Sequence, residues 1–505
     1  MVSKIHSCGL LGLDGYIVEV ETDIGKGLPR IDVVGLPDAS VKESKDRVYS
    51  AIKNCGYNYP VSRITVNLAP GELKKEGPVY DLPILVGILC SSGQLPAPES
   101  DLCMIGELSL EGKLRPANGV LSMAIHAKKA GMRGIFVPEE NAPEAAMVEG
   151  LEVYPVRDLT QLAAHLKGEE LISPAEHREF VPCEAESLDF ADVIGQETAK
   201  RALMIAAAGS HHALLIGPPG SGKSMLAKRL PSILPDLTEE EALECTQIHS
   251  VAGLLSRSEP MMTTRPVRAP HHSISPNGIS GGGTKPRPGE ISLAHNGVLF
   301  LDELPEFQRD TLESLRQPIE DGKVTISRVA ATCTYPSRFM LICAMNPCRC
   351  GFYGHPTKKC ICTENQLREY RRRISGPLLD RIDIQVTVSP VPYDELETRP
   401  RGESSQSIRA KVNAARAIQR ERYKEYGITS NAQLTAAMMS VFCQPDEKGQ
   451  AILRAAYDKL GLSARGYDKL LKLARTIADI EGKEQISGEH IAEAVQYRLL
   501  DRDKF

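Results

Sequence analysis

The chain has 505 residues, too many for one hydrophobic core, so the sequence predicts several domains. Hydrophobic residues make up 42 % and charged residues 25 %, as in an ordinary globular protein. The formal net charge of −5 excludes a protein whose whole surface is basic, so any DNA-binding surface has to be local. Trp is absent and aromatic residues make up only 5 %, which argues against an open stacking platform for single strands.

The amino-terminal end shows no targeting or membrane segment. Strand-like alternation and a charged Glu19 stand where a signal peptide would have its apolar segment. The longest apolar run, 82–90, is about half the length that spans a bilayer. Thirteen cysteines without an export signal are expected to stay reduced. We therefore expect a cytoplasmic protein that does not contact a membrane.

Four regions follow one another along the chain. Residues 1–168 alternate short strand-like runs with helical stretches, and residues 169–190 form a polar linker interrupted by prolines. Residues 191–395 alternate strand, loop and helix, which predicts an α/β core with a mostly parallel sheet. Residues 396–505 carry apolar side chains at helical spacing, notably over 408–426, which predicts a helical domain.

A phosphate-binding loop follows the apolar run 213–216 of the core. It matches the pattern G-x-x-x-x-G-K-[ST] between a strand and a helix. Its glycines let backbone N–H groups face the phosphates of ATP, Lys223 reaches the β- and γ-phosphates, and Ser224 binds Mg²⁺. The loop consists of Gly217, Pro218, Pro219, Gly220, Ser221, Gly222, Lys223 and Ser224.

Two later apolar strands end in polar residues. The run 298–301 precedes Asp302 and Glu303, at the strand end where parallel sheets bind ligands. This predicts that Asp302 holds Mg²⁺ and that Glu303 orients and deprotonates the attacking water. The run 339–345 ends at Asn346, which is placed to touch the γ-phosphate or the water. Taken alone, an Asn before Pro347 is better explained as a turn residue.

The motifs together resemble those of the Mg-chelatase-like AAA+ ATPases, specifically the ComM/YifB branch, over nearly the whole chain. Besides the phosphate loop, the segments that carry the resemblance are 192–203, 268–275, 281–307, 344–348, 375–383 and 462–480. The resemblance implies an AAA+ core with a helical lid and assembly of identical chains into a ring, a hexamer. It also implies the helix-2-insert clade, which includes the MCM helicases and the motor subunit of magnesium chelatase.

In that clade two elements line the central channel of the ring. Here they correspond to the insert 265–295 and to a β-hairpin predicted at 324–335. Lys285, Arg287 and Arg328 are therefore candidates for contact with the phosphate backbone of DNA. The alternative, that they are ordinary exposed charges, stays open because backbone contact requires only charge near the strand.

Two further arginines match positions of the family. Arg381 resembles the arginine finger, which would act on ATP held by the neighbouring subunit and suits the role as a permanently charged fork. Arg465 resembles the sensor 2 arginine at the start of a helix. The sequence leaves open whether Arg465 reaches ATP in its own subunit or in the neighbour.

Four cysteines cluster between Asn346 and Arg381, namely Cys348, Cys350, Cys360 and Cys362. Four thiolates on two tight turns predict a closed, structural Zn²⁺ site without an open position for catalysis. The C-x-C spacing is tighter than that of common zinc ribbons, so four unligated thiols remain the alternative.

The first 168 residues are similar to the Lon-type protease domain, with the pattern carried by 71–89 and 106–131. The positions of the catalytic Ser and Lys of that domain correspond to Val79 and Leu121. Because neither side chain can attack a carbonyl or take a proton, we expect a proteolytically inactive scaffold.

The leading functional prediction from the resemblance is an ATP-driven DNA translocase that promotes branch migration in recombination and natural transformation. The alternative is a chelatase-like motor that uses the same ATPase to remodel a protein partner. An ATP-dependent protease is a third class, and Val79 and Leu121 argue against it. The predicted cofactors are ATP, Mg²⁺ and structural Zn²⁺.

Overall fold

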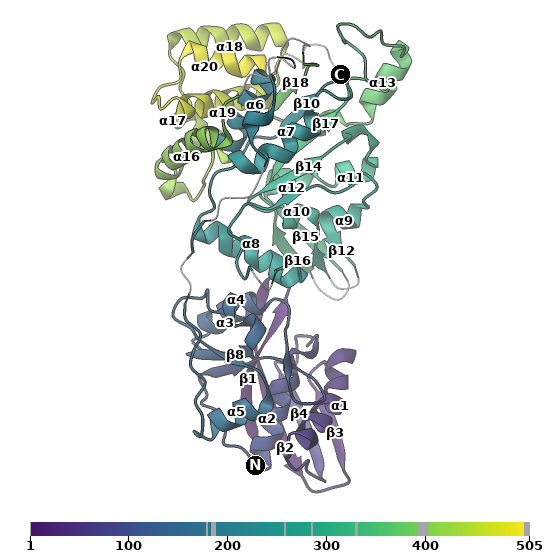
Figure 1. Ribbon diagram of the computed structural model, residues 1–505, viewed down its shortest axis with the longest axis vertical. Helices are drawn as coiled ribbons and strands as arrows, with labels where there is room; N and C mark the ends of the chain where they lie inside the picture. The colour runs from purple at the N-terminus through teal and green to yellow at the C-terminus, as the bar shows by residue number, and fades with distance from the viewer. Residues whose placement is uncertain are drawn as a thin grey trace.

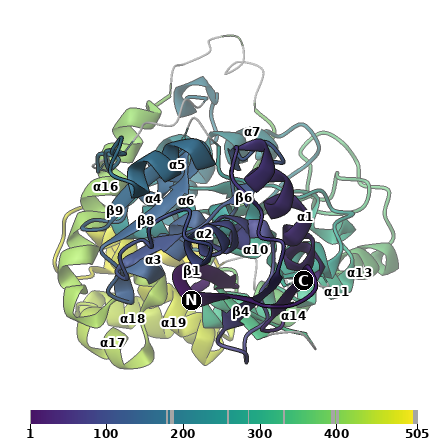
Figure 2. The same cartoon turned by 90° about the horizontal axis from the view of Figure 1, so that it is seen from below.

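The computed structural model describes residues 2–177, 180–182, 188–256, 259–283, 286–328, 332–391, 397 and 402–498. Figure 1 shows an elongated molecule, with the amino-terminal region at one end and the core and carboxyl-terminal helices at the other. Seen from below, the amino-terminal region lies in front of the other two (Figure 2). The described part of the predicted linker, 169–177, 180–182 and 188–190, contains no α-helix or strand, and a short 3₁₀ helix, Phe190–Asp192, begins at its end.

The amino-terminal region is built on a seven-stranded mixed sheet. Its strand order is β3 (Arg30–Val34), β4 (Arg63–Ala69), β2 (Asp14–Gly25), β1 (Ser3–Leu11), β5 (Leu102–Met104), β8 (Gly134–Pro138) and β9 (Glu152–Val156). A short hairpin joins β6 (Glu107–Leu108) to β7 (Leu114–Arg115). The helices are α1 (Ala39–Asn54), α2 (Asp81–Ser91), α3 (Val120–Lys129), α4 (Ala142–Ala145) and α5 (Leu159–Leu166). Helix α2 is apolar nearly all round because it is buried along most of its length.

The core is built on a five-stranded sheet in which every neighbouring pair is parallel. The order is β11 (Val267–Arg268), β14 (Val298–Leu301), β17 (Met340–Met345), β10 (Ala213–Ile216) and β18 (Ile384–Thr387). All residues of β10, β14 and β17 are buried, which explains why these strands read as continuous apolar runs. The sheet confirms the predicted α/β core.

Helices and two small hairpins surround this sheet. The helices are α6 (Glu197–Gly209), α7 (Lys223–Arg229), α8 (Glu239–Ala252), α9 (Pro276–Ser280), α10 (Glu290–Leu293), α11 (Arg309–Glu313), α12 (Arg316–Asp321), α13 (Glu364–Arg372) and α14 (Gly376–Leu379). One hairpin pairs β12 (Gly281–Gly282) with β13 (Arg287–Pro288), and the other pairs β15 (Lys323–Ser327) with β16 (Thr332–Pro336). The second confirms the hairpin predicted at 324–335.

The carboxyl-terminal region is helical, as predicted. It contains α16 (Ser405–Arg422), α17 (Ala436–Phe442), α18 (Glu447–Leu460), α19 (Ala464–Ile480) and α20 (Gly488–Gln496). One hydrophobic core joins it to the sheet, with Leu215 of β10 and Ala474 of α19 in the same buried cluster. The carboxyl-terminal helices are therefore packed directly on the α/β core of the same chain.

Helix α8 connects the core with the amino-terminal region. Its Ala242 and Cys245 pack in one buried cluster with Leu121 of α3. At its end, the Ser250 hydroxyl donates to Glu144 Oε2 (2.8 Å), and the Gly119 N–H donates to the Ser250 carbonyl (3.2 Å). The two regions are thus joined by apolar packing and by buried hydrogen bonds.

Candidate active site

The phosphate loop lies at the carboxyl end of β10, where the strand gives way to α7. Gly222 has φ 97°, a left-handed conformation that favours glycine, and α7 begins at the next residue. The buried Lys223 ammonium donates to the carbonyls of Gly217 (2.7 Å) and Pro218 (2.9 Å). Burial lowers the pKa of Lys223, while Asp302 opposes that shift. The loop thus has the predicted strand–loop–helix form.

Two strands away, β14 carries the predicted carboxylates. The Ser224 hydroxyl donates to Asp302 Oδ2 at 2.7 Å, so the two predicted Mg²⁺ ligands already lie together. Glu303 has φ 52°, which is uncommon for a residue other than glycine, and its side chain is exposed. Strained positions of this kind cluster at functional sites.

Asn346 follows β17, the strand between β10 and β14. Its Oδ1 accepts a hydrogen bond from Lys223 Nζ at 3.1 Å. The Gly217 N–H donates to the carbonyl of Met345, so the end of β17 is tied to the start of the loop. The structure therefore brings Asn346 to the phosphate-loop lysine, which a turn residue would not require.

These groups fit Mg²⁺ and a nucleotide triphosphate. The ammonium group of Lys223 and the N–H groups at the start of α7 supply positive charge for phosphates. Ser224 and Asp302 offer the oxygen ligands that Mg²⁺ prefers. Glu303 would stand beside them as a general base. Within the described residues, the buried Ser221 hydroxyl has no protein partner, as expected for a group that meets a ligand.

Arg381 and Arg465 lie together near the amino ends of the sheet strands, at the opposite strand ends from the phosphate loop. Arg381 precedes β18, whose far end pairs Thr387 with Ile216, immediately before the phosphate loop. Arg381 Nη2 lies 2.6 Å, and Arg465 Nη2 lies 3.2 Å, from Glu320 Oε1. One carboxylate thus holds both predicted catalytic arginines on the side of the core that faces away from its own phosphate loop.

The four clustered cysteines form a compact sulfur site. Their Sγ atoms all lie within 4.8 Å of one another, and three of the separations are 3.4, 3.6 and 3.7 Å. A tetrahedron of thiolates around Zn²⁺ has S–S separations of about 3.8 Å, so the donor set fits such an ion. Backbone N–H groups of Phe352 and Ile361 lower the pKa of Cys350 to about 6, which favours its thiolate form.

The loop that carries the four cysteines packs against the phosphate loop. Gly351 has φ 83°, and a Cβ atom there would come within 2.4 Å of Pro219 Cδ, so only glycine fits. A pocket of about 210 Å³ lies between the two loops, lined among others by Pro218, Tyr353 and His355. The sulfur site therefore supports the backbone beside the predicted ATP site.

The insert and the second hairpin lie side by side. Arg287 is paired with Gly282 in the insert, and Arg328 of the hairpin approaches the same glycine. Tyr335 donates from its hydroxyl to the carbonyl of Pro286 (2.9 Å), which joins the two elements. Arg287 and Arg328 are exposed and both lie next to Gly282, whereas Lys285 lies outside the described residues.

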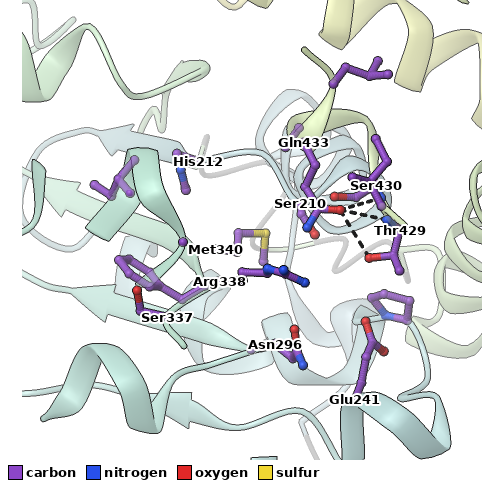
Figure 3. Close-up of a pocket in the computed structure, with 18 of the residues that line it drawn as sticks. Ser210, His212, Glu241, Asn296, Ser337, Arg338, Met340, Thr429, Ser430 and Gln433 are labelled. Carbon is purple, nitrogen blue, oxygen red and sulfur yellow. Dashed lines mark hydrogen bonds between the residues drawn. The ribbon is translucent and has the colours of Figure 1, made fainter. Parts of the chain in front are cut away.

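A larger pocket, of about 490 Å³, lies at the amino ends of the sheet strands, between the core and the carboxyl-terminal helices. In Figure 3, His212, Asn296 and Met340 line one side, and Thr429 and Ser430 line the other. These first three residues lie at the amino ends of β10, β14 and β17, whereas the phosphate loop follows the carboxyl end of β10. The larger pocket is therefore not the nucleotide site.

Three sequence patterns of the magnesium chelatase subunit ChlI match the chain. The pattern described as "Magnesium chelatase, subunit ChlI" matches residues 189–396, "Subunit ChlI of Mg-chelatase" matches 20–141, and "Magnesium chelatase, subunit ChlI C-terminal" matches 402–498. The chain is 45 % identical over 503 residues to the uncharacterized protein YifB of Escherichia coli (strain K12), which covers 99 % of this chain and 98 % of YifB. It is 43 % identical over 507 residues to the competence protein ComM of Haemophilus influenzae, and this match covers 99 % of this chain and 97 % of ComM.

The chain belongs to the Mg-chelatase-like ComM/YifB family of AAA+ ATPases. Membership confirms the family resemblance seen in the motifs, and ATP with Mg²⁺ follows as the ligand set of an AAA+ site. A Lon protease of Mycolicibacterium smegmatis is 26 % identical over 164 residues, 30 % of this chain and 21 % of that protease. Among the described residues, no helix combines the length and apolar character needed to cross a membrane.

In this ComM/YifB family member, the two positions predicted to match the Lon catalytic residues hold apolar side chains that pack in hydrophobic clusters. Val79 is half-buried against two hydrophobic clusters of the amino-terminal region. Leu121 is fully buried in the cluster with Ala242 and Cys245 of α8. The position predicted to match the catalytic lysine of Lon-type proteases therefore makes an apolar contact with the core.

Sequence reasoning missed two residues at the site. His272 Nδ1 lies 3.5 Å from Glu303 Oε2, and it belongs to the segment 268–275 that carried the family resemblance without an assigned role. Glu320 holds Arg381 and Arg465, and no motif marks it. The signal for His272 was available in the motif, whereas the role of Glu320 depends on long-range contacts, with Arg381 within the core and with Arg465 of α19.

Proposed function

We propose that the chain forms a ring and acts as an ATP-driven DNA translocase that promotes branch migration in homologous recombination and natural transformation. The observation that carries the proposal is the juxtaposition of the insert and hairpin, with Arg287 and Arg328 exposed beside Gly282. A motor that reads no base sequence needs cations for the phosphate backbone, and these two elements supply them. The name of the relative ComM, a competence protein, agrees with a role in natural transformation.

The nucleotide site would work through residues already in contact. Lys223 exchanges its carbonyl partners for the β- and γ-phosphates, while Asn346 next to it senses the γ-phosphate. Ser224 and Asp302 would hold Mg²⁺, which neutralises developing phosphate charge. Glu303 takes the proton of the attacking water.

Assembly would complete this site. Arg381 and Arg465 are held by Glu320 near the amino ends of the sheet strands, whereas the phosphate loop follows the carboxyl end of β10, which supports action on a neighbouring chain. In a ring, this side of one chain would face the phosphate loop of the next. Both arginines then act in trans, and the four cysteines hold structural Zn²⁺ that steadies the loop against Pro219.

The DNA assignment is tested by replacing Arg287 and Arg328 with Ala. Binding of a labelled four-way junction should weaken at least tenfold at low salt, because each lost phosphate contact removes the free energy gained from releasing a counterion. DNA-stimulated ATPase should disappear. Basal ATPase should stay unchanged because neither residue belongs to the nucleotide site. The matched control replaces Lys448 and Arg454, two exposed cations of α18.

Two results would redirect the proposal. If the Arg287→Ala/Arg328→Ala variant unwinds the junction at the parental rate, DNA does not pass these elements. If the parental protein neither binds nor moves any DNA, the chelatase-like alternative takes over, in which the same ATPase remodels a protein partner. The three matches to ChlI patterns give that alternative its support.

A further inference from the structure

The segment around the sulfur site is strongly basic although the whole chain is acidic. Residues 347–373, here called the cysteine unit, comprise the loop with the four cysteines and helix α13. They contain seven Lys or Arg residues and two Glu residues, while the net charge of the chain is −5. Neither the nucleotide site nor the zinc ligation requires this charge.

Four of these cations are exposed and have no carboxylate partner within the described residues. They are Arg349, Lys358, Lys359 and Arg372. By contrast, Arg373 pairs with Glu306 at 2.9 Å and Arg368 lies 3.6 Å from Glu364. The unpaired cations are therefore concentrated on one compact element, where their charges are not neutralised by the protein itself.

The cysteine unit holds these cations on a fixed support. The sulfur cluster closes its loop, and the Arg371 guanidinium lies 5.1 Å from the centre of the Tyr353 ring, which joins the loop to α13. Gly351 rests on Pro219 of the phosphate loop. In Figure 1, α13 lies at the far end of the molecule from the amino-terminal region, whereas β12 and β16 lie nearer its middle.

We propose that the cysteine unit is a second binding surface for the phosphate backbone of DNA, separate from the insert and hairpin. This inference rests on the proposed function in taking DNA as the partner. A polyanion is favoured over an acidic protein because exposed large apolar side chains in the unit are limited to Tyr353 and Ile361, too few for the apolar centre of a protein interface. Such a surface binds without regard to base sequence.

The position of the unit links this surface to ATP hydrolysis. Cys348 follows Asn346 by two residues, and Asn346 contacts Lys223. The loop also touches Pro219 directly. DNA on the cysteine unit therefore acts on a loop that supports the nucleotide site, and its loss should reduce stimulation of the ATPase by DNA as well as affinity.

The test replaces Arg349, Lys358, Lys359 and Arg372 together with Ala in the full chain. The junction affinity should fall about tenfold or more at low salt. The plot of log K against log salt should become less steep by about 3.6 units if all four cations contact phosphates, since each contact contributes about 0.9. Basal ATPase and metal content should match those of the parental protein. The control replaces four exposed cations of the carboxyl-terminal helical region, Lys448, Arg454, Lys459 and Lys483.

The outcomes separate this inference from the proposed function. Parental affinity and salt slope in the quadruple variant, with Arg287→Ala/Arg328→Ala defective, would overturn the cysteine-unit surface alone. A parental protein that binds no DNA would overturn both. If the quadruple variant loses ring assembly but its assembled fraction keeps full DNA affinity, the unit is a subunit contact and the inference is wrong. If the quadruple variant loses metal, the Lys358→Glu/Lys359→Glu variant with full metal content is measured instead. Weaker junction affinity and a shallower salt slope support the surface, and parental values overturn it.

Discussion

In the core, Lys223, Ser224, Asp302 and Asn346 come from three different strand ends and meet within hydrogen-bond distance. In the amino-terminal region, the positions predicted to match the catalytic Ser and Lys of Lon-type proteases hold Val79 and Leu121, and Leu121 packs against α8 of the core. The chain thus has a polar site in the core and an apolar contact between regions at the second predicted position. A fold retained from an enzyme is therefore no guide to activity without its side chains.

The largest expected effect tests whether the polar site is complete only between chains. Arg381→Ala should bind ATP but hydrolyse it about 10³-fold or more slowly, because an arginine that stabilises phosphate charge contributes that much. Mixing it with Lys223→Ala should partly restore hydrolysis, since some interfaces then pair an intact loop with an intact arginine. The measurement is steady-state ATPase over a range of mixing ratios with mixed rings verified. Absence of rescue would argue that Arg381 acts within its own chain.

A second comparison separates binding from chemistry inside the polar site. Glu303→Gln should retain ATP and slow hydrolysis about 10²- to 10⁴-fold, the range of a lost general base. Lys223→Ala should instead weaken ATP binding. Equilibrium binding of a fluorescent ATP analogue and single-turnover hydrolysis distinguish the two. Near-normal turnover in Glu303→Gln would show that another group, with His272 the nearest candidate, activates the water.

The sulfur site is expected to contribute through structure rather than chemistry. Purified protein should contain about one Zn²⁺ per chain, and Cys348→Ser with Cys360→Ser should lose it, because two thiolates cannot close a tetrahedral site. Elemental analysis and thermal unfolding provide the readouts. Metal-free protein prepared under reducing conditions with unchanged stability would contradict the assignment.

Substitutions at Leu121 and Val79 should change the stability of the folded chain and should not create protease activity. Leu121→Ala should cost about 2–5 kcal/mol, the range for emptying a buried leucine site, and loosen the contact with α8. Leu121→Lys with Val79→Ser should cleave no peptide, since the lysine would be buried against the core. Denaturant unfolding and a fluorogenic peptide assay measure these effects. Peptide cleavage by the double variant would mean that the site remains open.

The smallest expected effect is a pH dependence of folding stability from Glu144, which lies at the contact between the amino-terminal region and α8. Burial raises the pKa of Glu144, whose carboxylate accepts from Ser250 and Asn141. The folded chain then holds this proton more tightly than the unfolded chain, so the contribution is most favourable at low pH and declines as pH rises from the ordinary glutamate pKa through the raised one. Glu144→Gln should flatten that part of the stability profile. An identical profile in both proteins would exclude Glu144 as its source.

Local features of the fold were predictable because short patterns dictate local backbone. The loop at 217–224 appears between a strand and a helix, and the hairpin at 324–335 has its two strands as predicted. The helix predicted at 408–426 begins earlier, at Ser405, because the Ser404 hydroxyl accepts from the Ser407 N–H and caps it. It ends at Arg422, before a short 3₁₀ turn.

Long-range contacts were not predictable from one sequence. Glu320 meets Arg381 through the fold of the core and meets Arg465 only because α19 packs on that core, and no spacing in the sequence encodes either contact. The burial of Leu121 under α8 likewise depends on how two separate regions dock. The roles of Lys285, Arg287 and Arg328 stay predictions, and Lys285 lies outside the described residues.

The pairing of Arg381 and Arg465 on Glu320 has a numerical consequence if these arginines act in trans. An isolated chain then contains both halves of a catalytic centre but no whole one. An open row of chains always has one complete centre fewer than it has members, whereas a closed ring has as many centres as chains, whatever its size. Closing the last gap would therefore add a full turnover unit without adding any protein, so specific activity would report ring closure directly.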